Sequence, residues 1–277
     1  MMEAGFSSYA MGWAVSPQPD GRRSAGIHEV LERAIALGYR RAQLADNVAP
    51  HALDDASKAR LRQRARESGV TLEIGARGLT EANLDRHLEL AVELDSPFVR
   101  FVIDGPAYEP DADTIATLLR GRRSQLEDNS IALVIENHDR FRATEFVHII
   151  ETADSTLVGV CLDTANSFGA GEDLYTVISL LGPHTMNVHL KDVRMRRVES
   201  QQGFIIEGTP LGEGQLPLRW ALEQLAATGR CRSATLEHWV PPEARFEDTL
   251  RKEAAWCVRS TSCMRQWFPN SFSPVVR

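Results

Sequence analysis

The chain has few cysteines and no long hydrophobic run, and each shortage excludes a class of protein. Its four cysteines, Cys161, Cys231, Cys257 and Cys263, form neither a CxxC pair nor the spacing of a zinc ribbon. We therefore expect reduced thiols, as in a cytoplasmic protein. No apolar stretch approaches the roughly 18–20 residues of a membrane span, and no basic segment precedes an apolar run at the N-terminus. Neither a membrane partner nor a secretory signal is expected.

A basic excess and a glycine-rich phosphate loop are also missing. The net charge is −7, which argues against a nucleic-acid partner because phosphate binding needs a basic face, although a local patch can exist within an acidic total. The first apolar segment leads into SSYAMGWAVSPQPDG, which matches neither GxGxxG nor GxxxxGK[ST]. This absence disfavours an open, doubly wound sheet that binds a nucleotide. No linker or low-complexity segment divides the chain.

What the sequence does contain is a repeated alternation of amphipathic helix, polar break and short apolar strand. Apolar residues at helical spacing predict a helix over 27–37, Gly38 ends it, and RRAQLADN follows as a strand. The same order recurs in RESGVTLEIGAR, ELDSPFVRFVID, EDNSIALVIENH, ADSTLVGVCLDTAN, LGPHTMNVHLKD and ATGRCRSATLEHW. With GFSSYA at the start, the pattern gives eight strands.

Eight alternating units predict an α/β protein with a single (β/α)8 TIM-barrel domain, and 277 residues suit that fold. We assign residues 1–268 to the barrel and residues 269–277 to a loose C-terminal tail. The segment VRMRRVESQQGFIIEGTPLGEG (193–214) is long for a connection. Since it follows a strand, it is expected on the catalytic face as an ordered hairpin or a lid.

Four polar residues stand at the ends of four successive predicted strands: Glu136, Asp163, His189 and Glu237. Any one of these acids could simply cap a helix or pair with a basic neighbour. Together, three carboxylates would repel one another unless a cation lay between them. One imidazole with three carboxylates suits Mn2+, Mg2+ or Co2+ better than the closed tetrahedron of structural Zn2+. The sequence therefore predicts a site for one divalent metal ion.

The motifs ENH, LDTAN, HLKD and LEH, in this order, resemble the xylose-isomerase-like TIM-barrel superfamily of sugar isomerases, ketose 3-epimerases, dehydratases and apurinic-site endonucleases. The resemblance implies that Glu136, Asp163, His189 and Glu237 are the metal ligands, and that Glu136 and Glu237 also transfer protons. Ketose 3-epimerases usually have histidine where this chain has Asn166. The endonucleases need more histidines than this chain offers, so a nuclease is disfavoured.

The long segment after HLKD and the SSYAMGWA start look closest to a subgroup that includes decarboxylases of 3-oxo sugar acids such as 3-oxo-isoapionate. Further residues are expected to bind substrate. Alternation along strands places His138 beside Glu136 and Lys191 beside His189. Arg100 could bind a substrate carboxylate or pair with a buried acid. The full set of predicted substrate-binding residues is His138, Asn166, Lys191, Arg100, Arg77, Tyr9 and Trp13, the last two with packing as the alternative.

These features predict a metal-dependent isomerase or epimerase that acts on a keto sugar through a metal-stabilised enediolate. The alternative is a metal-dependent decarboxylase or dehydratase of a 3-oxo sugar acid. A barrel that only binds sugars should have lost a ligand, and none is missing. The expected partner is a small-molecule sugar or sugar acid, and a homo-oligomer is possible.

Overall fold

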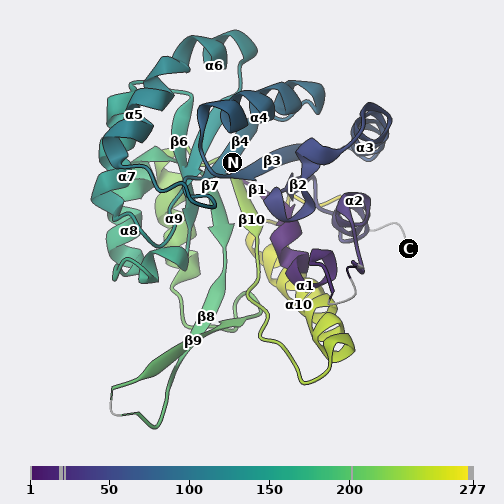
Figure 1. Cartoon of the computed structure of the whole chain (residues 1–277). Helices are drawn as coiled ribbons and strands as arrows, with labels where there is room; N and C mark the ends of the chain where they lie inside the picture. The colour runs from purple at the N-terminus through teal and green to yellow at the C-terminus, as the bar shows by residue number, and fades with distance from the viewer. Residues whose placement is uncertain (1, 19–20, 22, 201, 274–277) are drawn as a thin grey trace.

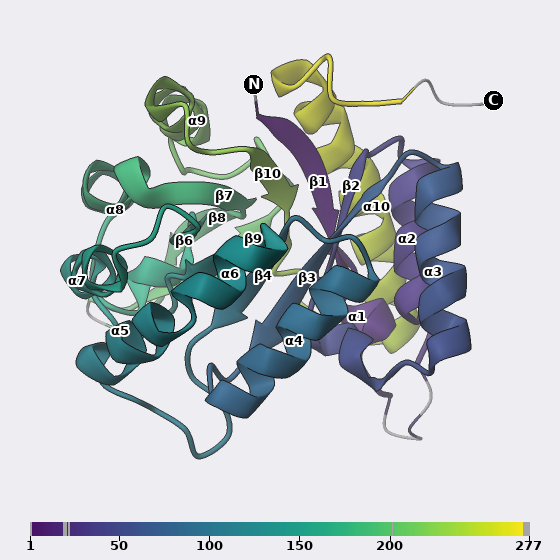
Figure 2. The same cartoon turned by 90° about the horizontal axis from the view of Figure 1, so that it is seen from above.

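Eight parallel strands close into a barrel, which confirms the predicted (β/α)8 fold. The computed structural model describes residues 2–18, 21, 23–200 and 202–273. The strand order is β1-β10-β7-β6-β5-β4-β3-β2, and β1 pairs with both β10 and β2 (Figures 1 and 2). The barrel strands are β1 (Glu3–Ser7), β2 (Arg41–Leu44), β3 (Thr71–Arg77), β4 (Phe98–Val102), β5 (Ala132–Glu136), β6 (Val158–Asp163), β7 (Thr185–Leu190) and β10 (Ser233–Leu236).

Helices surround the barrel, as Figure 2 shows from above. The helix predicted over 27–37 is confirmed as α2, which buries Ile27, Val30 and Leu31 against the strands and is followed by Gly38 at φ 78°. The α-helices are α1 (Gly12–Val15), α2 (Ile27–Ala36), α3 (Asp55–Glu67), α4 (Glu81–Glu93), α5 (Ala112–Gly121), α6 (Arg123–Asn129), α7 (Ala143–Ala153), α8 (Leu174–Leu181), α9 (Leu218–Thr228) and α10 (Phe246–Trp267). Short 3-10 turns are η1 (Ser8–Met11), η2 (Asp46–Val48), η3 (Pro50–Ala52), η4 (Asn166–Phe168) and η5 (Gly182–His184). No helix in these described ranges is long and apolar enough to cross a membrane.

The interior of the barrel is divided into an apolar and a polar part. Phe98, Val134 and Cys161, from β4, β5 and β6, belong to a small hydrophobic cluster separate from the main core between strands and helices. On the other side, Gln43 of β2 contacts Asn187 of β7. Because β2 and β7 are not neighbours in the barrel, this contact crosses its interior. The polar part lies against His189, whose Nε2 atom is 2.7 Å from Gln43 Oε1.

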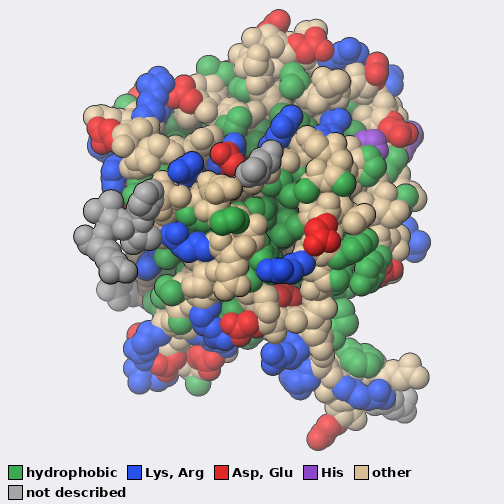
Figure 3. Space-filling model, turned by 180° about the vertical axis from the view of Figure 1, so that it is seen from behind, with side chains coloured by type: hydrophobic (Ala, Val, Ile, Leu, Met, Phe, Trp, Pro, Cys, Tyr) green, Lys and Arg blue, Asp and Glu red, His purple; other side chains and the backbone are tan. Residues whose placement is uncertain are grey.

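The long segment after β7 forms an antiparallel hairpin, as predicted. Strands β8 (Asp192–Arg197) and β9 (Phe204–Thr209) pair along their whole length and project away from the carboxyl ends of the barrel strands (Figures 1 and 3). At its base, the Asp192 carboxylate accepts hydrogen bonds from the backbone N–H groups of Gly212 and Gly214, both at 2.9 Å. The hairpin is therefore anchored at the catalytic face and exposed beyond it.

The expected loose tail is corrected for the residues up to Ser273. Phe272 is 9% exposed, and its ring lies 4.9 Å from the Tyr39 ring, centroid to centroid. The Ser273 N–H donates to the Gly38 carbonyl at 2.8 Å. The sequence did not predict this packing, because a single aromatic residue among polar ones does not indicate a buried position. Residues 274–277 of the predicted tail lie outside the described residues.

We expect Phe272→Ala to lower the free energy of unfolding by about 3 kcal/mol, because it removes a buried ring and leaves a cavity against Tyr39. Urea denaturation of the two proteins measures the difference. Phe204→Ala, at a hairpin position that is 60% exposed, is the matched control and should change the same quantity by less than about 0.5 kcal/mol. Equal effects of the two substitutions would contradict the assignment of the tail to the core.

Candidate metal centre

The structure brings the four predicted ligands together at one end of the barrel. Glu136 and Asp163 are the last residues of β5 and β6, His189 lies in β7, and Glu237 directly follows β10. The His189 Nδ1 atom lies 3.4 Å from Glu136 Oε2, 3.9 Å from Asp163 Oδ2 and 3.4 Å from Glu237 Oε1. All four side chains are at most 3% exposed. Parallel strands in register end at one level, and that places the side chains around one point.

The atoms that face this point fit a cation. Glu136 Oε2, Asp163 Oδ2 and His189 Nδ1 are buried and, apart from the ion pairs of the two carboxylates with Arg100 and Lys191, have no hydrogen-bond partner among the described residues. Buried polar atoms rarely stay unsatisfied, so three of them facing one another indicate a group that accepts all three as ligands. Three oxygens and one nitrogen suit Mn2+, Mg2+ or Co2+. The residues present therefore fit the predicted divalent ion.

Hydrogen bonds orient the three carboxylates. In Glu136 and Asp163 they engage one oxygen and leave the other toward the centre, whereas in Glu237 the bonded oxygen is itself the one that faces His189. The Asn166 amide donates to Glu136 Oε1 at 2.8 Å, and Ser7 Oγ donates to Glu237 Oε1 at 2.9 Å. Asp163 Oδ1 accepts from the backbone N–H groups of Ala165 and Asn166. Asn166, predicted to bind substrate, is thus in direct contact with a predicted ligand.

Two buried cations border the ligands. Lys191 Nζ lies 2.7 Å from Asp163 Oδ2 and 3.1 Å from Glu237 Oε2, and it lies 5.1 Å from the centroid of the Trp239 ring. Arg100 Nε lies 3.1 Å from Glu136 Oε2. Burial alone would raise the pKa of the Glu136 carboxyl, but Arg100 and then His189 bring that pKa below its ordinary value. The pKa of Asp163 is raised by burial in spite of Lys191.

Of the two roles expected for Arg100, the structure shows pairing with buried acids. The guanidinium is 1% exposed and reaches both Glu136 and, at 3.6 Å, Asp46. Gly75, opposite Arg100 in the β3–β4 register, makes room for it, because a Cβ there would lie 3.3 Å from Arg100 Cζ. This contact explains a glycine inside a barrel strand.

Three further predicted residues lie at the mouth of the barrel rather than at the ligands. Tyr9 donates its hydroxyl hydrogen to Asp46 at 2.9 Å, and Arg77 Nε lies 3.7 Å from the same carboxylate. The Trp13 indole N–H donates to the Val240 carbonyl at 2.8 Å. Tyr9 and Trp13 line a cavity of about 460 Å³, with Trp239 and Ile206 of the hairpin among its other walls. Packing and pocket lining, the two roles weighed for Trp13, are both realised.

Within the described residues, His138 makes no hydrogen bond or ion pair with the four predicted ligands, and its role in substrate binding stays a prediction. It lies two residues beyond the end of β5, and its described ion pair is with Asp139 at 3.4 Å. Alternation placed it on the face of Glu136, but the strand ends at Glu136, so the alternation does not extend to His138.

Sequence reasoning missed the polar residues beneath the centre. Gln43 Oε1 lies 2.7 Å from His189 Nε2, and Gln43 also contacts Glu73 and Asn187. Gln43, Glu73 and Asn187 are fully buried. A signal was present, since RAQL, TLEIGAR and TMNVHL each carry a polar residue inside an apolar strand.

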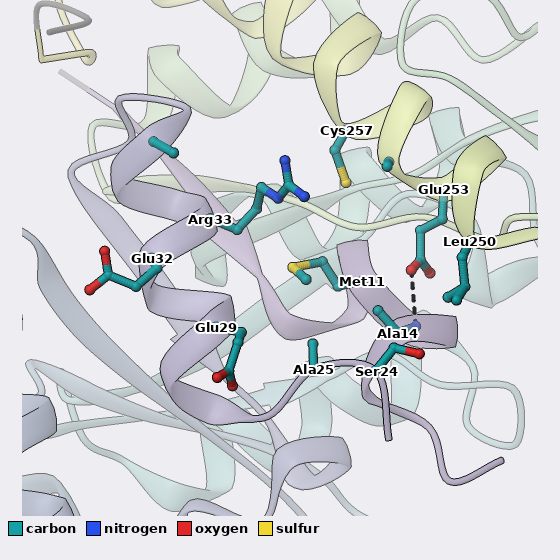
Figure 4. Close-up of a pocket in the computed structure, with 12 residues that line it drawn as sticks. Met11, Ala14, Ser24, Ala25, Glu29, Glu32, Arg33, Leu250, Glu253 and Cys257 are labelled. Atoms are coloured by element: carbon teal, nitrogen blue, oxygen red, sulfur yellow. Dashed lines mark hydrogen bonds between the residues drawn. The ribbon is translucent and has the colours of Figure 1, made fainter. Parts of the chain in front are cut away.

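A buried acid on α10 holds the first loop in place. The Glu253 carboxylate accepts hydrogen bonds from the backbone N–H groups of Trp13, at 2.7 Å, and Ala14, at 3.0 Å. Figure 4 shows Glu253 pointing from α10 toward Ala14 beside a cavity of about 470 Å³. Glu253 also lines the mouth cavity, so it connects α10 to the wall that Trp13 provides. Burial raises the pKa of Glu253 to about 7, although these two hydrogen bonds lower it.

Comparisons with known proteins agree with this geometry. A family model described as a xylose isomerase-like TIM barrel matches residues 31–259. The chain is 33% identical over 262 residues to the 3-oxo-isoapionate decarboxylase of Pectobacterium atrosepticum, with 94% of both chains covered. A crystal structure of D-psicose 3-epimerase in the presence of D-fructose has a TM-score of 0.71 at 18% identity, covering 96% of this chain and 99% of that one. A xylose isomerase-like TIM barrel protein from Mycobacterium smegmatis, in complex with magnesium, has a TM-score of 0.68 at 16% identity, covering 95% and 97%. At these identities the two structures show the fold alone.

The raised pKa of Glu253 predicts a pH-dependent stability. Between its ordinary pKa of 4.5 and its folded pKa of about 7, the folded chain binds a proton that the unfolded chain does not, so the contribution of Glu253 to stability falls as pH rises through this window. Glu253→Gln removes the titration. The free energy of unfolding of this variant, relative to wild type, should rise by up to about 3 kcal/mol from about pH 5 to about pH 8.

Urea denaturation of the metal-free proteins at several pH values checks this expectation. Glu247→Gln, at an exposed position of the same helix, is the control and should show no such trend. A difference between Glu253→Gln and wild type that stays constant with pH would show that Glu253 does not titrate in this range.

Proposed function

Because the chain belongs to the xylose isomerase-like TIM-barrel family, we propose that it is a divalent-metal-dependent lyase that decarboxylates a 3-oxo sugar acid. The observation that carries the proposal is the pair of buried cations, Lys191 and Arg100, beside the ligands. The name of the relative that is 33% identical supports the same chemistry. The expected cytoplasmic location stays a prediction, in keeping with four free cysteines.

The charges around the centre favour an anionic substrate. Glu136, Asp163 and Glu237 supply three negative charges, and a divalent cation with Lys191 and Arg100 supplies four positive ones. The nearby Asp46 and Arg77 pair with each other and cancel. The occupied centre would therefore carry one excess positive charge in a buried place, where it is costly without a partner. A monocarboxylate sugar acid neutralises it, whereas a neutral ketose does not.

Decarboxylation of a 3-oxo acid places simple demands on the site. The bond between the carboxylate carbon and its neighbour breaks, CO2 leaves, and the electron pair moves onto the 3-oxo oxygen. The carbon then takes a proton that comes from solvent. A divalent cation, when bound, supplies Lewis-acid stabilisation of the charge on that oxygen.

The chain's own residues have separate tasks in this reaction. Lys191 lies between the ligands and Trp239, so we assign it to orient the substrate carboxylate. The aromatic walls of the mouth cavity, Tyr9, Trp13 and Trp239, hold the remainder of the substrate and keep water from the centre.

An isomerase or epimerase of keto sugars, the first choice from sequence, is the second candidate. Two carboxylates favour this candidate. Glu136 and Glu237 each lie 3.4 Å from His189 Nδ1, so the centre offers one group to remove a proton from a substrate and another to return it. Asn166, where the ketose 3-epimerases usually have histidine, and the cationic excess weigh against it.

The reaction can be tested directly with purified protein. With Mn2+ present, we expect release of CO2 from 3-oxo sugar acids such as 3-oxo-isoapionate, and no comparable proton exchange in neutral ketoses followed by NMR in D2O. A chelator should abolish turnover while circular dichroism still reports a folded barrel, because the core does not depend on the ion. Full activity of the chelated protein would contradict the metal dependence. Exchange in ketoses without decarboxylation would favour the second candidate.

Glu237→Gln separates the two reactions. The variant keeps the shape and one oxygen donor but loses the base. For an isomerase or epimerase we expect a loss of kcat of about 10²–10⁴-fold with metal still bound, as for removal of a general base. For a decarboxylase the bond-breaking step needs no base, so the loss should be smaller. Near wild-type epimerisation by the metal-loaded variant would exclude the proton-transfer role of Glu237.

A further inference from the structure

We propose that Glu73 and Gln43 form a positioning chain that determines which ring nitrogen of His189 faces the metal centre. The inference rests on the proposed metal site and concerns residues that do not touch the metal or the substrate. Glu73, Gln43 and His189 come from β3, β2 and β7 and are fully buried. His189 Nε2 lies 2.7 Å from Gln43 Oε1, and the Gln43 amide nitrogen lies 3.4 Å from Glu73 Oε2.

The orientation of the Gln43 amide is fixed from two sides. Arg41 can only donate, and its Nη1 lies 3.0 Å from Glu73 Oε1, so Glu73 is held as an acceptor. Burial raises the pKa of Glu73, and the ion pair with Arg41 opposes that effect. A carboxylate facing Gln43 requires the amide N–H on its side, which turns Gln43 Oε1 toward His189.

Asn187 fixes the same orientation independently. Its amide nitrogen lies 3.3 Å from the Ser233 carbonyl, which can only accept, so that nitrogen must point toward Ser233. The Asn187 Oδ1 atom then faces Gln43 and accepts from the Gln43 amide at 3.4 Å. Both hydrogens of the Gln43 amide are thus used, one by Glu73 and one by Asn187.

The tautomer of His189 follows from the orientation of the Gln43 amide. Gln43 Oε1 can only accept, so His189 must donate from Nε2, and the Nδ1 lone pair is left for the centre. Nδ1 is also the atom that lies among Glu136, Asp163 and Glu237. With the Gln43 amide reversed, an N–H would face Nε2 and the proton would move to Nδ1, where it excludes a metal.

Glu73→Gln tests the positioning chain at the residue farthest from His189. Since Arg41 only donates, the new amide must turn its oxygen to Arg41 and its N–H to the Gln43 N–H, which opposes the orientation that Asn187 holds and disturbs the hydrogen bond from Gln43 to His189. We expect Co2+ affinity, measured by titration calorimetry, to fall by at least about 10-fold, as it does when a hydrogen-bond partner of a metal-binding histidine is changed. The visible absorption of bound Co2+ should change as well, which a purely structural role would not require. Thr185→Val, a buried substitution in β7, the strand of His189, removes a hydroxyl bonded to Leu181; it is the control and should leave both unchanged.

The double variant Gln43→Glu with Glu73→Gln completes a double-mutant cycle. The carboxylate at 43 can accept from both His189 and the amide at 73, so the double variant should bind Co2+ more tightly than Glu73→Gln alone. Unchanged affinity in Glu73→Gln, or losses that simply add in the double variant, would overturn the positioning chain. If Glu73→Gln does not fold, Gln43→Leu removes the acceptor directly and must show the same loss. Absence of stoichiometric Co2+ binding by the wild-type chain would instead refute the metal site itself.

Discussion

The repulsion among three buried carboxylates is the constraint on which the rest of this molecule depends. Glu136, Asp163 and Glu237 surround His189 in a region with almost no access to water, where like charges are poorly screened. Lys191 and Arg100 supply part of the compensation from opposite sides. They neutralise two of three charges, and the proposed divalent ion would overcompensate the remainder. This charge balance is the reason for proposing both a cation and an anionic substrate.

The barrel makes such a concentration of charge possible because its strands are in register. Asp163 pairs with His189 across β6 and β7, so the two ligands stand at the same height without any special loop. Gly75 provides the volume that the Arg100 guanidinium occupies. The loops add the hairpin and the first loop, which Glu253 holds against α10. Scaffold and substrate pocket are thus built from separate segments.

The parts that sequence could predict are those whose signal is local. Glu136, Asp163, His189 and Glu237 each stand near the end of an apolar run, and a strand end can be recognised from a few neighbouring residues. Their position at strand ends could therefore be predicted from the sequence. Gln43 and Glu73 stand out in the sequence only as polar residues inside apolar strands, and their roles could not be predicted because their partners His189 and Arg41 are 146 and 32 positions away. His138 lies two residues beyond the end of β5, so alternation along that strand does not position it, and its role in substrate binding stays a prediction. The packing of Phe272 on Tyr39 likewise depends on a contact between the two ends of the chain.

The divided interior shows how stability and function compete in this barrel. An ion pair such as Arg41–Glu73 and a buried amide such as Gln43 contribute little to stability compared with well-packed hydrophobic residues of similar size. The chain has such residues on the β4–β6 side, at Phe98 and Val134, so an apolar interior is within its reach. Polar groups are found instead on the side that supports His189. Because a hydrophobic replacement there would leave the proposed His189 Nε2–H unsatisfied, the proposed need for His189 to present Nδ1 to a metal would account for a polar core that folding alone does not need.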